Sequence, residues 1–253
     1  MGKRILIAAP ANCKEEVFKE YLNSLNHLII PEDCIIDKFF VLNKNSVLKK
    51  FLKKEEYIEI ENNKIILEKE KNQQKQWKME NYYFIAFLRN CILKKAREEN
   101  YDYIFSIDSD VLVHPYTLIH LMNCKKDIIS TSVWTKLQNN ILSLNCGYHE
   151  QWGEYENKEP FKQKGIYKVG WVCIAVLISS KIFMNSNINY TQILGVDNTG
   201  SEDYAFFLKC YCNIPNLEVY ISTIYPARHL YHEKDYERWK YEKNFNYSSS
   251  TSI

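Results

Sequence analysis

The sequence predicts a three-layer α/β domain with a largely parallel β-sheet. Short aliphatic runs alternate along the chain with segments whose apolar residues recur every three or four positions. Such runs are typical of buried parallel strands, and such spacing is typical of the helices that cover a sheet. The length of 253 residues suits one domain at 1–246, followed by a serine-rich flexible tail at 247–253.

The elements follow one another in a regular order. The expected strands lie at 4–9, 35–42, 101–110, 128–134, 170–179 and 217–224. The expected helices lie at 14–25, 82–97 and 202–210, and a short one follows Pro115, because proline favours the first turn of a helix. Between 43 and 80 the composition shifts to Lys, Glu, Asn and Gln, which indicates a charged insertion or a helical excursion.

Composition argues against several classes of protein. Lysine and arginine number 33 against 31 acidic residues, so we expect no nucleic-acid partner. A hydrophobic share of 46% excludes global disorder, and the most apolar stretch, 172–178, is far shorter than the ~20 residues that span a bilayer. The eight cysteines form no CxxC pair, and the amino terminus shows no signal-peptide pattern. We therefore expect free thiols and a cytoplasmic location, while peripheral attachment to a membrane stays open.

The segment YDYIFSIDSD at 101–110 is the most informative part of the sequence. It is expected to be a strand that ends in Asp108 and Asp110, and residues two apart on a strand point to the same face. Ligands of open α/β sheets bind at the carboxyl ends of strands. Two carboxylates that converge there repel each other unless a cation lies between them, and hard oxygen ligands suit Mg²⁺ or Mn²⁺. Such an ion commonly takes phosphate oxygens as further ligands.

Four motifs occur in a definite order along the chain. They are Arg89-Asn90 in a predicted helix, the triplet from Asp108 to Asp110, Gly200-Ser201-Glu202-Asp203 at the start of a helix, and His229 after a strand. Together with Val169-Gly170-Trp171 before an apolar run, this order resembles the nucleotide-sugar half of GT-A fold glycosyltransferases, particularly the family 2-like group and its Anp1-type relatives. The resemblance covers about residues 4–232. It implies a GT-A fold and transfer of a sugar from a nucleoside-diphosphate donor to an acceptor hydroxyl.

The resemblance also implies how the donor and its metal ion are bound. Ala9 and Pro10 would lie beside the base of a UDP- or GDP-sugar, and Arg89 would lie near the diphosphate. Asp108, with Ser109 beside it, would contact the ribose or a metal-bound water. Asp110 and His229 would bind Mn²⁺ or Mg²⁺ directly, with Asp108 as the third member of the metal set.

For catalysis, the resemblance assigns Asp203 to the acceptor hydroxyl, with Glu202 as the alternative. A carboxylate in hydrogen-bond reach of that hydroxyl can remove its proton as general base, which an inverting enzyme needs. The family usually has a basic residue further along this helix, and the chain offers only Lys209, so the stereochemical outcome stays open. Trp171 and Trp134 are candidate stacking surfaces for the acceptor, a hydroxyl of a glycan, a lipid or a protein.

Each assignment has a structural alternative. The acids of the triplet could cap an ordinary turn, and those at 202 and 203 favour a helix amino terminus whether or not they catalyse anything. Arg89 could be a solvated charge. His229, which lies close to His232 in the sequence, could be an ordinary core or surface histidine rather than a metal ligand, and a tryptophan is more often a core residue than a sugar platform.

Three other functions would use similar residues. Metal-dependent phosphohydrolases also carry a DxD triplet after a strand, but Val111-Leu112 follows it here where those enzymes usually have Gly-Thr. A catalytically silent module that binds sugar nucleotides would retain the same acids. A nucleotidyltransferase is disfavoured because no glycine occurs between Lys3 and Asn145, where its phosphate-binding loop would lie.

Overall fold

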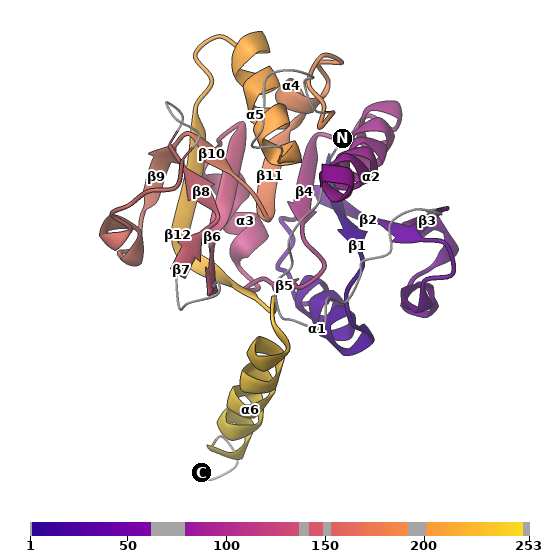
Figure 1. Ribbon diagram of the computed structural model, residues 1–253, viewed down its shortest axis with the longest axis vertical. Helices are drawn as coiled ribbons and strands as arrows, with labels where there is room; N and C mark the ends of the chain where they lie inside the picture. The colour runs from indigo at the N-terminus through magenta and orange to yellow at the C-terminus, as the bar shows by residue number, and fades with distance from the viewer. Residues whose placement is uncertain (1, 62–78, 137–141, 149–152, 192–200, 250–253) are drawn as a thin grey trace.

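One large mixed sheet runs through the middle of the computed structural model, which describes residues 2–61, 79–136, 142–148, 153–191 and 201–249 (Figure 1). The strands in these residues are β1 (Lys3–Ala11), β2 (Cys34–Asn43), β3 (Tyr57–Ile60), β4 (Tyr103–Ile107), β5 (Val111–Leu112), β6 (Ile128–Lys136), β7 (Leu142–Leu144), β8 (Cys146–Gly147), β9 (Ile166–Val169), β10 (Trp171–Val172), β11 (Ala175–Ser179) and β12 (Val219–His229). The order along the sheet is β3-β2-β1-β4-β11-β6-β12-β5, with β7 beside β6 and β9 beside β12.

Most neighbours in the central part of this sheet run parallel. β2 pairs in parallel with both β3 and β1, and β1 pairs in parallel with β4. β6 and β12 also run parallel, and the antiparallel strand β11 joins these two groups by pairing with β4 and with β6. The carboxyl ends of β1, β4, β6 and β12 therefore lie along one edge, where open α/β sheets bind ligands.

Helices cover both faces of the sheet (Figure 1). They are α1 (Glu15–Asn26), α2 (Met79–Glu98), α3 (Thr117–Asn123), α4 (Ser180–Phe183), α5 (Glu202–Asn213) and α6 (Glu233–Ser249). Residues of α2, α4 and α5 share one buried apolar cluster, and residues of α1 and α3 share the other. β1 alternates between the two, since Leu6 belongs to the first cluster and Ile5 and Ile7 to the second. The predicted three-layer α/β fold with a largely parallel sheet is confirmed.

Two predicted strands end differently in the structure. β4 stops at Ile107, so Asp108 and Asp110 lie in a turn, and the two-residue periodicity of a strand does not orient them. The single strand predicted at 170–179 is wrong, because β10 and β11 are separated by Cys173 and Ile174. The backbone φ of Ile174 is 74°, a value that a β-branched residue rarely adopts, so an aliphatic run gave no sign of this interruption.

The charged region predicted at 43–80 contributes partly to the sheet. Short 3₁₀ helices at Val47–Phe51 and Lys54–Glu56 lead into β3, which extends the sheet beside β2. The strongly charged run from Lys69 to Gln76 lies outside the described residues.

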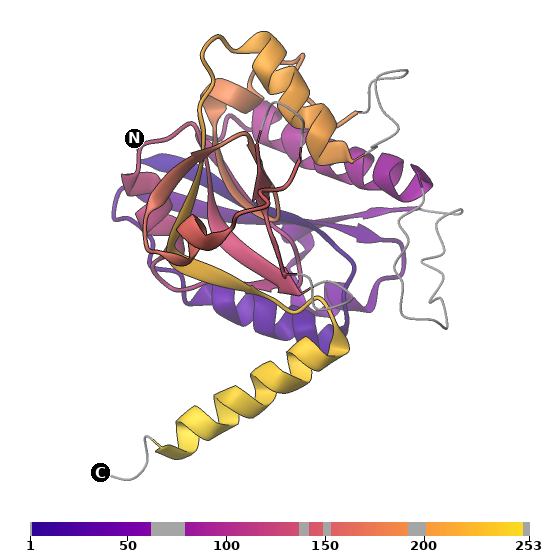
Figure 2. The same cartoon turned by 60° about the vertical axis from the view of Figure 1, so that its left-hand side comes forward.

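The carboxyl-terminal helix α6 projects from the body of the molecule (Figures 1 and 2). Two ion pairs of 2.6 Å attach α6 to the body: Glu233 pairs with Lys14, and Glu242 pairs with Arg228. Lys14 and Arg228 both lie near the carboxyl edge of the sheet. The helix continues to Ser249, so residues 247–249 of the predicted flexible tail are helical, and residues 250–253 lie outside the described residues. None of the helices in the described part of the chain combines the length and apolar character needed to cross a bilayer.

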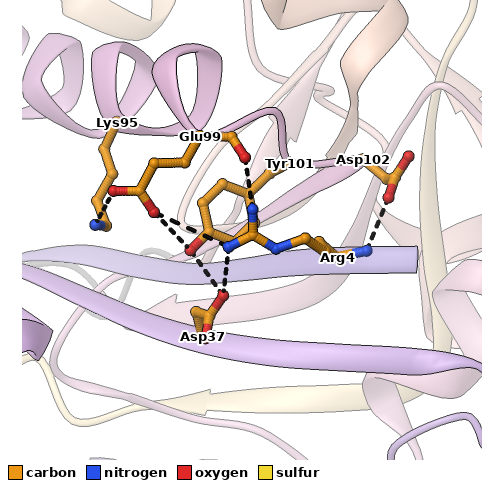
Figure 3. A network of polar contacts seen from close by, with 6 residues as sticks. All are labelled: Arg4, Asp37, Lys95, Glu99, Tyr101 and Asp102. Carbon is orange, nitrogen blue, oxygen red and sulfur yellow. Dashed lines mark hydrogen bonds and ion pairs between the residues drawn. The ribbon is translucent and has the colours of Figure 1, made fainter. Parts of the chain in front are cut away.

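A polar network ties together the amino ends of the central strands (Figure 3). Arg4 of β1 donates to the Asp37 carboxylate of β2 at 3.0 Å and to the Glu99 carbonyl at 2.6 Å. The hydroxyl of Tyr101 donates to the same Asp37 carboxylate at 2.8 Å, and its ring centre lies 4.3 Å from the guanidinium carbon of Arg4. This network fixes the edge of the sheet opposite the one where the acids lie.

Candidate active site at the carboxyl edge of the sheet

The acids Asp108 and Asp110 lie in a tight turn directly after β4. The Val111 amide donates to the Asp108 carbonyl at 3.0 Å, which closes this turn. The two carboxylates have different partners: that of Asp108 lies 3.1 Å from Arg89, and that of Asp110 lies 3.2 Å from His229. The turn therefore presents one acid toward α2 and the other toward the end of β12.

Four hydrogen bonds from other parts of the chain hold the turn and the end of β4 in place. The Tyr21 hydroxyl of α1 donates to the Ile107 carbonyl at 3.1 Å, and the Cys13 thiol donates to the Ser109 carbonyl at 3.2 Å. Burial raises the pKa of the Cys13 thiol to about 12, so it remains a neutral donor. The Asp108 amide donates to the Ile174 carbonyl at 2.9 Å, and the Leu230 amide donates to the Asp110 carbonyl at 2.8 Å. Ser109 is itself buried.

Arg89 is a buried cation that joins two segments of the site. Its Nη2 donates to Asp108 Oδ1 at 3.1 Å, its Nε to Glu202 Oε1 at 3.2 Å, and its Nη1 to Ser106 Oγ at 3.3 Å. Only 6% of Arg89 is exposed, and the Tyr190 ring lies 5.7 Å from its guanidinium carbon. The structural alternative of a solvated charge is therefore wrong. The guanidinium donates hydrogen bonds to two protein carboxylates. Its contact with a diphosphate stays a prediction.

Glu202 and Asp203 form the first turn of α5. The Ser201 hydroxyl caps this helix by accepting from the Tyr204 amide at 3.2 Å. Burial raises the pKa of Asp203 to about 8, and the neighbouring Glu202 carboxylate adds to this effect. Burial also raises the pKa values of Glu202 and Asp108, while Arg89 opposes the shift in each. A carboxyl group with a pKa near neutrality is suited to accept a proton from a substrate hydroxyl.

Asp110 and His229 meet because β5 and β12 pair. This short antiparallel contact sets Val111 opposite His229. The His229 Nε2 lies 3.2 Å from Asp110 Oδ1, while its Nδ1 lies 2.8 Å from the Thr135 hydroxyl of β6. The His229 side chain is 8% exposed and that of Asp110 is 24% exposed, so solvent or a ligand reaches the pair from the Asp110 side.

The pair offers part of a metal site. A carboxylate oxygen and an imidazole nitrogen are suitable ligands for Mn²⁺, and the ion would complete its coordination with phosphate oxygens and water. Asp108, the third predicted ligand, is ion-paired with Arg89. Within the described ranges, no group of three or more His, Cys, Asp or Glu side chains is arranged to hold a metal ion. Asp110 and His229 fit such an ion only together with ligands from a substrate.

The remaining predicted residues are Ala9, Pro10, Trp134 and Trp171. Ala9 is fully buried in β1, and Pro10 beside it is half-buried. Trp134 lies on β6 opposite Arg228 of β12, and Trp171 lies on β10 opposite Gly147 of β8; both rings pack against the apolar cluster on the α2 side. The buried indole Nε1 of Trp171 has no hydrogen-bond partner within the described residues.

Lys209 is not directed to the acids. Its ammonium group donates to the Asn189 side chain at 2.5 Å and to the Thr191 carbonyl. It supports the segment before α5 together with Asn90, whose side chain accepts from the Tyr190 amide at 2.9 Å. Arg89 and Asn90 thus act on one segment, because Tyr190 contacts both.

The sequence interpretation missed three polar residues of the site. Ser106, Thr135 and Asn145 are buried polar residues, and their side chains bond to Arg89, to His229 and to the chain before β11, respectively. A hydroxyl or amide inside an aliphatic strand is the only sign that the sequence carries, because it must find a partner when buried.

The comparisons with known proteins agree with this geometry. The family described as glycosyltransferase family 25, N-terminal domain, matches residues 42–226, which is more than half of the chain. The chain belongs to this glycosyltransferase family. The matched range includes Arg89, the two acids of the turn and the Glu202-Asp203 pair, while His229 follows it by three residues. No curated protein sequence matches the chain.

The likeness to one solved structure places this glycosyltransferase domain in the GT-A fold. It is similar to S. aureus TarS with a TM-score of 0.54 at 16% sequence identity, over 92% of this chain and 38% of TarS. The chain thus spans well under half of TarS, and at this identity the likeness concerns the fold alone. TarS 1-349 gives a TM-score of 0.47 at 16% identity, over 87% and 60% of the two chains. A197 from STIV gives 0.46 at 13% identity, over 91% and 87%. The predicted resemblance to GT-A glycosyltransferases is confirmed, and the narrower Anp1-type grouping stays a prediction.

Proposed function

We propose that this glycosyltransferase domain transfers a sugar from a nucleoside-diphosphate donor to an acceptor hydroxyl with the help of a divalent cation. The observation that carries the proposal is the gathering of five charged or polar side chains from distant parts of the chain at one edge of the sheet. They are Arg89, Asp108, Asp110, Glu202 and His229, and Asp203 adjoins them.

Asp110 and His229 would hold Mn²⁺ or Mg²⁺. When bound, such an ion neutralises the charge that develops on the departing nucleoside diphosphate. The carboxylate side of this pair is the more exposed, so the diphosphate would approach from there. Ala9 and Pro10 at the end of the neighbouring strand β1 would flank the nucleotide base of a UDP- or GDP-sugar.

Asp203 would remove the proton of the acceptor hydroxyl. Its raised pKa supports this role, because a base with a pKa near the working pH is populated in its charged form and still binds a proton well. Glu202 is the less suitable base, since its carboxylate is held by Arg89 at 3.2 Å and only 6% of the residue is exposed. Trp171 and Trp134 would offer apolar surface to the acceptor.

Arg89 would then act mainly by fixing the two acidic segments relative to each other. It bonds Asp108 of the turn and Glu202 of α5 at the same time, so it sets the distance between the donor side and the acceptor side of the site. Reacting groups must be held to within a fraction of an ångström for efficient transfer.

Donor hydrolysis tests the proposal. The protein is incubated with UDP-glucose, UDP-galactose, UDP-N-acetylglucosamine, GDP-mannose and GDP-fucose, each with Mn²⁺, with Mg²⁺ and with EDTA, and nucleoside diphosphate is quantified by chromatography. We expect slow release of UDP or GDP from at least one donor only when metal is present. Release of phosphate from p-nitrophenyl phosphate, with every sugar nucleotide intact, would instead support a phosphohydrolase.

A further inference from the structure

A strained three-residue turn lies beside Asp108. The Ala175 amide donates to the Cys173 carbonyl at 2.9 Å, which closes a γ-turn with Ile174 at its centre. The φ of Ile174 is 74°, the sign that belongs to the rarer and less stable form of this turn. A β-branched residue persists in such a conformation only when its surroundings impose it, and such residues concentrate at functional sites.

Two buried polar side chains hold the carbonyls on either side of Ile174. The Asn145 Nδ2 donates to the Cys173 carbonyl at 2.7 Å. The Ser130 hydroxyl of β6 lies 2.8 Å from the Ala175 carbonyl and 2.8 Å from the carbonyl of Thr131, and its proton is shared between the two. Asn145 is 3% exposed and Ser130 is 0% exposed, and they bond each other at 2.9 Å. Asn145 is fixed in turn to β6, because its Oδ1 accepts from the Val133 amide at 2.7 Å.

The γ-turn acts on the candidate site in two ways. The Ile174 carbonyl accepts from the Asp108 amide at 2.9 Å, so it holds the first residue of the acidic turn. On the other arm, burial raises the pKa of the Cys173 thiol, and the charges of Asp203 and Asp108 add to this effect. Ile174 itself packs against the apolar cluster on the α1 side.

We propose that Ser130 and Asn145 are positioning residues for glycosyl transfer: they impose the γ-turn at Ile174, and this turn holds Asp108 against Arg89. The inference rests on the proposed function for its effect on turnover. The holding of Asp108 is independent of that function, because it concerns one backbone hydrogen bond in the free protein.

The test compares two serines on the same strand. Ser130→Ala removes the hydroxyl that bonds Ala175, whereas Ser132→Ala removes a hydroxyl that is equally buried and has no hydrogen-bond partner in the described parts of the chain. Amide hydrogen exchange of Asp108 is measured by NMR in the protein without ligands. We expect exchange about tenfold faster in Ser130→Ala and unchanged in Ser132→Ala. Equal exchange in both variants would overturn the inference.

Enzyme kinetics provide the second part of the test. With the UDP- or GDP-sugar that the wild type hydrolyses, we expect Ser130→Ala to lower kcat about tenfold and to leave the donor KM within about twofold, while Ser132→Ala changes neither. A loss equal in the two variants would contradict a positioning role. Ser130→Cys, which keeps the size with a weaker donor, serves if Ser130→Ala does not fold, and we expect intermediate exchange and kcat. Absence of turnover in the wild type would defeat the proposed function and leave the exchange comparison decisive for the turn.

Discussion

The Nε of Arg89 lies 3.2 Å from Glu202 Oε1, although 113 residues separate them in the sequence. The same guanidinium reaches Asp108 through Nη2 at 3.1 Å. A buried cation between two carboxylates stabilises the arrangement only while all the partners are present, since removal of the cation leaves buried charge without compensation. Arg89 thus makes the acidic turn and the start of α5 depend on each other.

Replacement of this cation should therefore destabilise the protein strongly. We expect Arg89→Met to lower the free energy of unfolding by about 3–5 kcal/mol, measured by urea denaturation. Lys94→Met, on an exposed position of the same helix, should cost no more than about 0.5 kcal/mol. Arg89→Lys keeps the charge but not the fork of donors, and we expect it to lower kcat more than it raises the donor KM. The opposite split would mean that Arg89 binds the diphosphate.

The pKa of Asp203 makes stability and activity depend on pH in opposite directions. Its folded-state pKa is raised from 3.8 to about 8, so between these values the folded protein binds a proton that the unfolded chain lacks. This contribution to stability is complete below the unfolded pKa and is lost as the pH rises through the folded pKa. We expect Tm to fall between pH 5 and pH 8.5, and to fall less in Asp203→Asn.

Asp203 should also determine how kcat/KM depends on pH. Because the base must be unprotonated, kcat/KM should rise with pH and level off near the raised pKa of Asp203. Asp203→Asn should lose this dependence together with most of the turnover. Glu237→Gln, which removes an exposed acid of α6, serves as the control and should retain the wild-type profiles of both Tm and kcat/KM. A wild-type kcat/KM that falls between pH 5 and pH 8.5 would contradict the assignment of Asp203 as the base.

Thr135 should affect metal binding without touching the ion. Its hydroxyl lies 2.8 Å from His229 Nδ1, so it orients the imidazole whose other nitrogen faces Asp110. We expect Thr135→Val to weaken Mn²⁺ binding in the presence of UDP by about 10–100-fold, as judged by calorimetry, and Thr135→Ser to retain it. Equal affinities in the two variants would show that this hydrogen bond has no such role.

The network around Arg4 should matter for stability alone. Tyr101→Phe removes the hydroxyl that donates to Asp37 at 2.8 Å, at the edge of the sheet opposite the acids. We expect it to lower the free energy of unfolding by about 0.5–1.5 kcal/mol in urea denaturation and to leave donor hydrolysis unchanged. A change in kcat would indicate communication between the two edges, which the described contacts give no reason to expect.

Periodicity predicted the elements that bury a continuous apolar surface. β1, α1 and β2 begin and end close to their predicted bounds, because each carries a long run or stripe of apolar residues. The strands β5, β8 and β10 have two residues each, too few for any period to be visible. The polar helix α6 lacks an apolar stripe, and it was not predicted for that reason.

The structure brings together several of the residues that the sequence indicated, but their contacts could not be predicted. Asp108, Asp110 and His229 do lie near one another, but the argument for the two acids assumed a strand where the chain makes a turn. The ion pair of Arg89 with Glu202 is invisible in the sequence, because it depends on how α2 and α5 pack against the same face of the sheet. The γ-turn at Ile174 is imposed by side chains more than 25 residues away in the sequence, so no local signal marks it.

The measurement that tests the central claim most directly is the thermal shift produced by UDP together with Mn²⁺ in wild-type protein, in Asp110→Asn and in Asp33→Asn. Asp33 is an exposed acid at the opposite edge of the sheet and serves as the matched control. We expect the nucleotide to raise the wild-type and Asp33→Asn Tm only when Mn²⁺ is present, and EDTA to abolish the shift. Asp110→Asn should show no metal-dependent shift. A shift of equal size in Asp110→Asn would contradict the claim that Asp110 and His229 hold the ion that binds the diphosphate.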